Sequence, residues 1–302
     1  MRSKHMFRKE YLGRTTVTVF GIFIIALTLA ITCFLFIKGL ATFVNNKHSV
    51  FEFLFSSKWR PDEMDGKGSV GAAVFIFGSI AVSLIAILIA TPFSVAAAVF
   101  MTEISPNFGR KLLQPAIELF VGIPSVVYGW VGLTVLVPFL ARTFHLVYGY
   151  GLLAGSIVLS VMIFPTITSV SADALRNVSR SYREASYGLG STRWQLIRRV
   201  IVPSAVPGIL TGVILGLARA FGEALAVAMV IGKTQAFPKS IFSPTTNLTA
   251  EIATNMGNTV TGSEYNNALW TMALLLLLIS FIFILLIRVV GRKGGVKHDK
   301  RS

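Results

Sequence analysis

Residues 17–37 read VTVFGIFIIALTLAITCFLFI and contain no charged side chain. A helix needs about 20 mostly apolar residues to cross the hydrocarbon core of a bilayer, so this stretch alone is long enough to span a membrane. It is also longer than the apolar core of a typical signal peptide, and Lys38 follows it without a small-x-small cleavage pattern. We therefore predict that residues 17–37 form a retained membrane helix.

Five further apolar runs follow the first one. They lie at residues 70–90, 112–140, 152–170, 206–232 and 268–287. Runs of this length favour helices, which satisfy their own backbone hydrogen bonds in lipid, over the short alternating strands of a β-barrel. The composition agrees, because 54% of the residues are hydrophobic and 14% are charged, whereas soluble domains have about 25% charged residues. The sequence predicts an all-α polytopic membrane helix bundle with six transmembrane helices, and it excludes a soluble globule.

The basic residues are distributed unevenly around the predicted spans. Lys and Arg total 28 against 13 Asp and Glu, which gives a net charge of +15. With the N-terminus placed inside, the inside segments hold 19 basic residues and the outside segments hold 8. Cytoplasmic segments retain Lys and Arg, so we predict that both termini are cytoplasmic. The basic tail 288–302 should then lie near anionic lipid headgroups, and the charge is explained without a nucleic-acid partner.

Patterns typical of catalytic and metal sites are missing from the sequence. The histidines lie in separate segments without the paired spacing of a metal site; they are His5, His48, His145 and His298. Gly232-Lys233-Thr234 imitates the end of a phosphate-binding loop, but Val227 stands where that loop requires glycine. We predict a chain without enzymatic activity, metal or cofactor. If it takes part in active transport, a separate subunit must hydrolyse the nucleotide.

One charged pair lies inside the predicted span 206–232. Arg219 and Glu223 are four residues apart, so on a continuous helix they would be neighbours on one face. Ionisable groups at membrane depth are costly and normally face a bundle interior or a polar pathway. A guanidinium presents a planar fork of donors that suits phosphate oxygens. Two interpretations remain open, which are an ion pair that fixes helix packing and a transient anion contact on a translocation pathway, and we favour the second.

The polar segment 171–203 lies between the fourth and fifth predicted spans. Its residues 179–203 read SRSYREASYGLGSTRWQLIRRVIVP, which predicts two short amphipathic helices at about 184–187 and 194–200. Gly188 and Gly190 would form the bend between them, and Pro203 would end the second helix before a turn into the next span.

This segment resembles the EAA loop of bacterial ABC-importer permeases. Glu184-Ala185-Ser186 is followed after three residues by Gly190 and after nine more by Val200, and Val202-Pro203 closes the pattern. The family pattern has Ala at 186, Ile at 200 and Leu at 202, so these three positions depart from it modestly. The resemblance implies a coupling loop that docks on an ATP-binding subunit, with Glu184, Ala185, Ser186, Gly190 and Pro203 as its characteristic residues. The alternative is a surface helix that lies at the lipid headgroups.

Two further stretches sharpen the resemblance. Residues 216–224, GLARAFGEA, and residues 118–129, ELFVGIPSVVYG, resemble the permeases of the bacterial phosphate-specific ABC transporter. Ala224-Leu225-Ala226 stands where the PstA-type permease usually has Thr-Ala-Pro, so the PstC type is favoured over the PstA type. The resemblance implies the type I (MetI-like) permease architecture in a single domain, residues 1–302. Its permease core would occupy about 70–290 and its coupling loop about 171–203.

The same resemblance implies a function and partners. The chain would be an inner-membrane permease subunit that carries inorganic phosphate by alternating access, with Arg219 and Glu223 on the pathway. Its partners would be a PstA-type second permease, an ATP-binding cassette ATPase dimer and an extracytoplasmic phosphate-binding protein. A divalent anion entering against about 100 mV is opposed by about 4 to 5 kcal/mol, which favours an energised importer.

Three rival functions remain. The chain could be an ABC permease for another oxyanion, such as sulfate, molybdate or phosphonate. It could be a stand-alone channel or secondary transporter, which would move anions without an ATPase, or a membrane enzyme, which would show substrate turnover by the purified chain.

Overall fold

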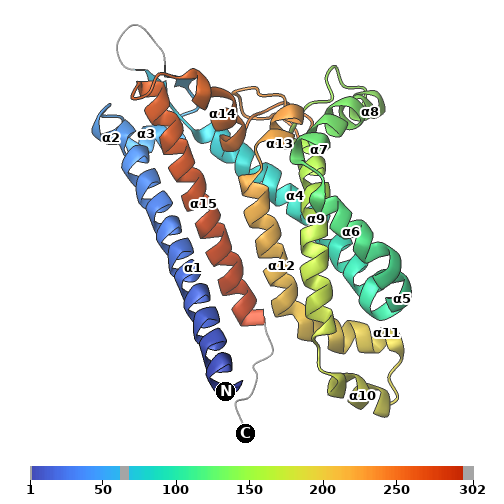
Figure 1. The fold of residues 1–302 in the computed structure, drawn as a ribbon. Coiled ribbons are helices and arrows are strands. Elements are labelled where there is room, and N and C mark those ends of the chain that lie inside the picture. The colour runs from blue at the N-terminus through green and yellow to red at the C-terminus, as the bar shows by residue number, and fades with distance from the viewer. Residues whose placement is uncertain (1, 62–67, 295–302) are drawn as a thin grey trace.

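The computed structural model describes the backbone of residues 2–61 and 68–294, with side chains for residues 13–61 and 68–289. Within these residues, six helical segments are long and apolar enough to cross a membrane. They are Gly13–Val44, Ala73–Ile104, Ser125–Thr143, Leu152–Arg176, Arg193–Gly222 and Glu264–Val289. Figure 1 shows them as a bundle. The predicted all-α membrane bundle with six spans is confirmed, and most of the predicted basic tail, residues 295–302, lies outside the described residues.

The first and last spans pack against each other. Helix α1 (Arg2–Gly39) continues into α2 (Ala41–Val44) and lies along α15 (Glu264–Gly294). The rings of Phe34 and Trp270 meet edge to face at 5.2 Å. The buried Thr271 hydroxyl oxygen lies 2.6 Å from that of Thr42 and 2.7 Å from the Gly39 carbonyl oxygen. Most side chains of α1 from Gly13 onward are exposed, as expected for a helix that faces lipid.

The centre of the bundle consists of α4 (Ala73–Val99), α9 (Leu152–Arg176) and α12 (Val202–Gly222). Buried aliphatic side chains from all three helices meet there, including Val82, Ile163 and Val213. Gly216 of α12 allows a close approach, because a Cβ at this position would lie 2.7 Å from Cγ1 of Ile167. Small residues serve this purpose in membrane bundles, where packing rather than the hydrophobic effect drives helix association.

Four π-helical turns in the described part of the chain are each followed within two residues by proline. The turns are Phe100–Ile104, Gly109–Leu113, Gly132–Leu136 and Ile197–Ile201, and the prolines are Pro106, Pro115, Pro138 and Pro203. Proline has no N–H and its ring clashes with the carbonyl of the preceding turn, and a π turn widens the helix there. The prediction that Pro203 ends the loop helix is therefore wrong. Helix α11 (Arg193–Leu196), the π turn and α12 form one continuous helical segment.

The third predicted span, 112–140, is divided. Helix α5 (Pro106–Phe108) precedes α6 (Gln114–Gly122), and the chain is extended at Ile123 and Pro124, with ψ of 128° and 141°. Helices α7 (Ser125–Val131) and α8 (Val137–Thr143) follow. A residue before proline is driven out of the helical region, which explains the break at Ile123. Only the part from Ser125 to Thr143 is long enough to be a span.

The remaining elements lie at the two ends of the bundle (Figure 1). One end carries α3 (Val50–Phe55), α14 (Leu248–Asn255) and the antiparallel strands β1 (Trp59–Arg60) and β2 (Ser69–Val70), whose Trp59 pairs with Val70. The other end, here called the loop end, carries α10 (Arg180–Gly188), α11, the start of α1 and the end of α15. The start of α1 and the end of α15 thus lie at the same end of the bundle as the 171–203 loop. That this end faces the cytoplasm stays a prediction.

Candidate functional site

The fifth span breaks at Glu223. Helix α12 ends at Gly222, Glu223 is extended with φ −77° and ψ 121°, and α13 (Leu225–Val230) begins after Ala224. The Glu223 carboxylate accepts a hydrogen bond from the backbone N–H of Ala226 at 3.0 Å. This bond satisfies one of the free N–H groups at the start of α13, as a capping side chain does. The predicted span 206–232 is therefore wrong beyond Gly222.

Arg219 occupies the last turn of α12, where the partial negative charge of a helix C-terminus favours a cation. Its Nη1 donates a hydrogen bond to Oγ1 of Thr166 on α9 at 3.2 Å. Among the residues that the structure describes, this is the only side-chain hydrogen bond of Arg219, and it forms no ion pair with Glu223. The helix ends between the two residues, so the prediction that they are neighbours on one helical face is wrong.

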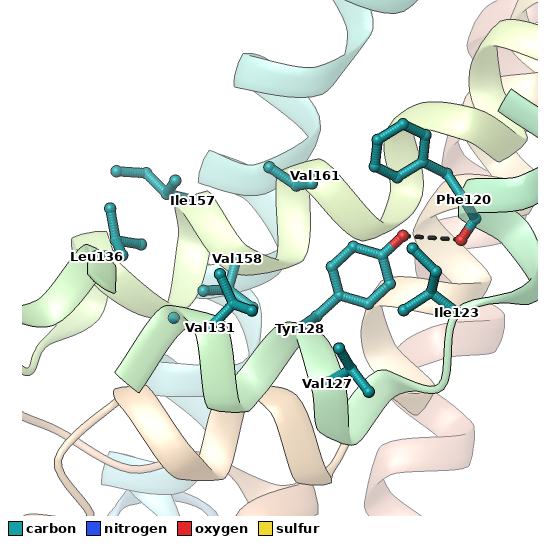
Figure 2. Close-up of a pocket in the computed structure, with 10 residues that line it drawn as sticks. Phe120, Ile123, Val127, Tyr128, Val131, Leu136, Ile157, Val158 and Val161 are labelled. Carbon is teal, nitrogen blue, oxygen red and sulfur yellow. Dashed lines mark hydrogen bonds between the residues drawn. The ribbon is translucent and has the colours of Figure 1, made fainter. Parts of the chain in front are cut away.

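The broken third and fifth spans contact each other through α7 and α13. Gly129 makes the contact close, since a Cβ there would lie 2.7 Å from Sδ of Met229 and 2.9 Å from Cα of Ala226. Tyr128 is the residue that precedes Gly129 on α7. Its hydroxyl donates a hydrogen bond to the Phe120 carbonyl oxygen at 2.7 Å, across the break between α6 and α7 (Figure 2). The two breaks and Arg219 thus lie in one region.

An apolar pocket of about 360 Å³ lies beside Tyr128. Figure 2 shows its wall, which is formed by Phe120, Ile123, Val127, Tyr128, Val131, Gly132, Leu136, Ile157, Val158 and Val161. The one hydroxyl in this wall already donates to the Phe120 carbonyl oxygen. The pocket therefore offers no donor to an anion, whereas Arg219 has five N–H donors and uses one of them on Thr166.

The loop end contains the two short helices that the sequence predicts. Ser179 caps α10 by accepting the Ser181 N–H at 3.4 Å, and Thr192 and Gln195 form a reciprocal capping box at the start of α11. Gly190 lies in the bend with a φ of +76°, a conformation that side chains other than glycine rarely adopt. The predicted pair of helices with Gly190 in the bend is confirmed, whereas Gly188, predicted for the same bend, is the last residue of α10.

The characteristic loop residues differ in exposure. Glu184, Ala185 and Gly190 are exposed, and Glu184 pairs with Arg180 at 2.9 Å. Pro203 is exposed on the side of the continuous helix. Ser186 is buried instead, and its hydroxyl oxygen lies 2.6 Å from that of Ser191. Ser186 therefore connects α10 to the bend and does not contribute to the outer surface.

Sequence reasoning missed three residues that attach the loop to the bundle. Glu103, at the end of the second span, forms an ion pair with Arg183 of α10, and its carbonyl oxygen accepts a hydrogen bond from Arg193 of α11. Glu103 is buried, with 8% of its surface exposed. The available signal was that Glu103 is the one acidic residue between the second and third predicted spans, opposite a loop rich in arginine.

Comparison with known proteins agrees with this architecture. Residues 90–294 match the family described as binding-protein-dependent transport system inner membrane component. The chain is 56% identical over 287 residues to the probable ABC transporter permease protein YqgH of Bacillus subtilis, covering 95% of this chain and 92% of that protein. It is 37% identical over 269 residues to the phosphate transport system permease protein PstC of Mesorhizobium japonicum, covering 81% of each.

A solved structure has the same fold. A chain of the bacterial alginate ABC transporter, in complex with a periplasmic protein bound to alginate pentasaccharide, superposes with a TM-score of 0.61 at 17% identity, covering 96% of each chain. This likeness confirms the predicted ABC-importer permease fold. The matched segment includes the loop 171–203, the broken fifth span and the last span, and the chain belongs to the family of binding-protein-dependent transport system inner membrane components.

Proposed function

We propose that this chain is one of two permease subunits of an ATP-driven phosphate importer and that the region around Arg219 lies on the translocation pathway. The observation behind the proposal is that the Arg219 guanidinium, one turn before the break in the fifth span, has a single neutral hydrogen-bond partner among the described residues. The name of the Mesorhizobium japonicum relative supports phosphate as the solute. Arginine binds phosphate oxygens through parallel N–H donors, and the N–H groups of Arg219 not used by Thr166 can serve this purpose.

Glu223 has a different role in this proposal. Its carboxylate holds the start of α13 through the Ala226 N–H, so Glu223 shapes the break and leaves Arg219 uncompensated. A permanent carboxylate partner would compete with each arriving anion. We place Glu223 on the pathway as a residue that maintains its shape.

In this proposal the loop end contacts the subunits that hydrolyse ATP. We assign this end to the cytoplasm, together with both termini, and propose that the exposed surface around Glu184, Ala185 and Gly190 docks on an ATP-binding cassette ATPase dimer. A PstA-type permease would complete the pathway, and an extracytoplasmic phosphate-binding protein would deliver the solute. Each elementary charge moved against about 100 mV requires about 2.3 kcal/mol, which ATP hydrolysis by the partner subunit would supply.

The proposal is tested by uptake in proteoliposomes that contain the complete transporter. We expect Arg219→Gln to reduce phosphate uptake by about 10- to 100-fold, because a hydrogen bond to a charged group is worth about 1.5 to 3 kcal/mol. The control is Arg142→Gln, which changes an exposed arginine on α8, at the end of the bundle away from the loop end. Unchanged uptake by the Arg219 variant in an assembled complex would remove this residue from the mechanism.

The identity of the solute needs a separate measurement. One arginine does not discriminate between phosphate and another oxyanion, because both present oxygen acceptors to the same fork of donors. We expect unlabelled phosphate to compete with labelled phosphate and expect sulfate, molybdate and phosphonate to compete poorly. Strong competition by one of these three anions would assign the transporter to it instead.

A further inference from the structure

We propose that Glu103 is a positioning residue that couples the loop to the transmembrane bundle, an inference that rests on the proposed importer function. Glu103 lies in the π turn Phe100–Ile104 that ends the second span. Its carboxylate forms an ion pair with Arg183, whose second nitrogen, Nη2, donates to the Leu175 carbonyl oxygen at 3.1 Å. One guanidinium therefore joins α10 to the ends of both the second span and α9.

Arg193 makes a second attachment at the same point. Its Nη2 donates to the carbonyl oxygens of Glu103 and Ile104, the latter at 3.0 Å. These carbonyls lie at the end of a helical segment, where such groups lack an intrahelical partner, and a cation is favoured there. Both helices of the loop thus hold the end of the second span, one through the Glu103 side chain and the other through the Glu103 main chain.

An apolar cluster continues the connection into the bundle. Ala98 of α4, Leu175 of α9 and Leu196 of α11 are buried together with Ile197 and Ile201 of the π turn before α12. The loop, the second span, α9 and α12 consequently meet in one packed joint, here called the Glu103 joint, which comprises Glu103, Arg183, Arg193 and this cluster.

The Glu103 joint determines which helices a movement of the loop carries. Helix α11 continues into α12 without interruption, so a displaced loop acts directly on the helix that bears Arg219. Without the attachments at Glu103, α12 could tilt past α4 and α9 while these stay in place. With them, the three central helices move together. The Glu103 carboxylate is buried, so its replacement leaves Arg183 without its charged partner at this point.

The test compares transport with ATP hydrolysis in the reconstituted, complete transporter. We expect Glu103→Gln to lower phosphate uptake at least 10-fold while ATP hydrolysis stays within about 3-fold of the wild type, so that fewer ions move per ATP. Glu103→Asp, which keeps the charge, should recover part of the amount of phosphate moved per ATP. The control is Glu52→Gln, which changes an exposed acid at the opposite end. An unchanged ratio, including a proportional loss of both activities, would overturn the proposal.

A second readout does not depend on the solute. With Cys33→Ser as background, spin labels at Asn107 of α5 and Tyr182 of α10, both exposed, report the distance between the end of the second span and the loop. We expect a narrow distance distribution in the wild type and a broad one in Glu103→Gln. An equally narrow distribution in the variant would contradict the joint. If the wild type carries another oxyanion instead of phosphate, the proposed function fails, while the distance measurement still tests Glu103.

Discussion

Arg183 and Arg219 occupy two regions of the molecule and differ in what they bind. Arg183, at the loop end, contacts the Glu103 carboxylate and the Leu175 carbonyl oxygen. Arg219, in the last turn of α12, donates one hydrogen bond to the neutral Thr166 hydroxyl at 3.2 Å. The first arginine has a charged partner and connects three helical segments. The second retains a charge without a carboxylate partner among the described residues.

The difference shows that an arginine side chain can serve either as a fixed structural contact or as a reversible binding site for a solute. A guanidinium bound by a carboxylate and a carbonyl gives a defined geometry, which suits a mechanical joint. A solute-binding arginine must release its ligand, and a permanent carboxylate would hold it more tightly than a passing anion could. The break at Glu223 provides the separation, because it directs the carboxylate to the Ala226 N–H and away from Arg219.

The largest expected effect comes from giving Arg219 a carboxylate. Thr166→Asp would place a carboxylate at the position where a hydroxyl oxygen now accepts the hydrogen bond from the Arg219 guanidinium. We expect phosphate uptake to fall about 100-fold, because the anion contact worth up to about 3 kcal/mol is occupied and the new charge repels the solute. Uptake by the reconstituted complex measures the effect.

Thr166→Val is the matched control, because it removes the hydroxyl at nearly constant volume and adds no charge. Uptake should then stay within about 10-fold of the wild type, since a neutral hydrogen bond contributes about 0.5 to 1.5 kcal/mol. Equal losses in the two variants would mean that Thr166 matters for packing and that the missing carboxylate is not the distinguishing property of Arg219.

The sequence was sufficient where the signal is local. Apolar length predicts the six spans, and residues 184–203 predict two short helices around Gly190, as the structure has them. The prediction from residue spacing was wrong where it assumed an unbroken helix. Arg219 and Glu223 share a face only on an unbroken helix, and the chain leaves the helix after Gly222. The contact between Glu103 and Arg183 spans 80 positions, so no periodicity could reveal it.

A medium effect is expected from Arg183→Lys, which keeps the charge at the Glu103 joint. An ammonium is a compact charge without a fork, so lysine can hold the Glu103 carboxylate or the Leu175 carbonyl oxygen but cannot bridge both as arginine does. One lost hydrogen bond is worth about 1 kcal/mol, and we expect about a 5-fold loss of phosphate moved per ATP. The coupled uptake and ATPase assay measures this ratio.

Arg180→Lys is the comparison for that variant. Arg180 pairs with Glu184 on the exposed surface of the same helix, at 2.9 Å, and exposed pairs contribute little. The amount of phosphate that the Arg180→Lys variant moves per ATP should remain that of the wild type. A loss as large as that of Arg183→Lys would show that any change in arginine geometry on α10 disturbs coupling, and the contrast between joint and surface would disappear.

The smallest effect distinguishes a cap from an ion pair at Glu223. Glu223→Gln keeps an oxygen that can accept the Ala226 N–H, whereas Glu223→Ala removes it. We expect the alanine variant to lose about 1 kcal/mol of stability, as for a lost helix cap, and the glutamine variant to lose clearly less. The thermal unfolding midpoint of the purified complex shows which of the two variants is the more stable.

If Glu223 instead neutralised Arg219, the glutamine variant would leave a cation unpaired at membrane depth and would be at least as unstable as the alanine variant. The order of two conservative changes therefore decides whether the break in the fifth span keeps Arg219 free for a solute.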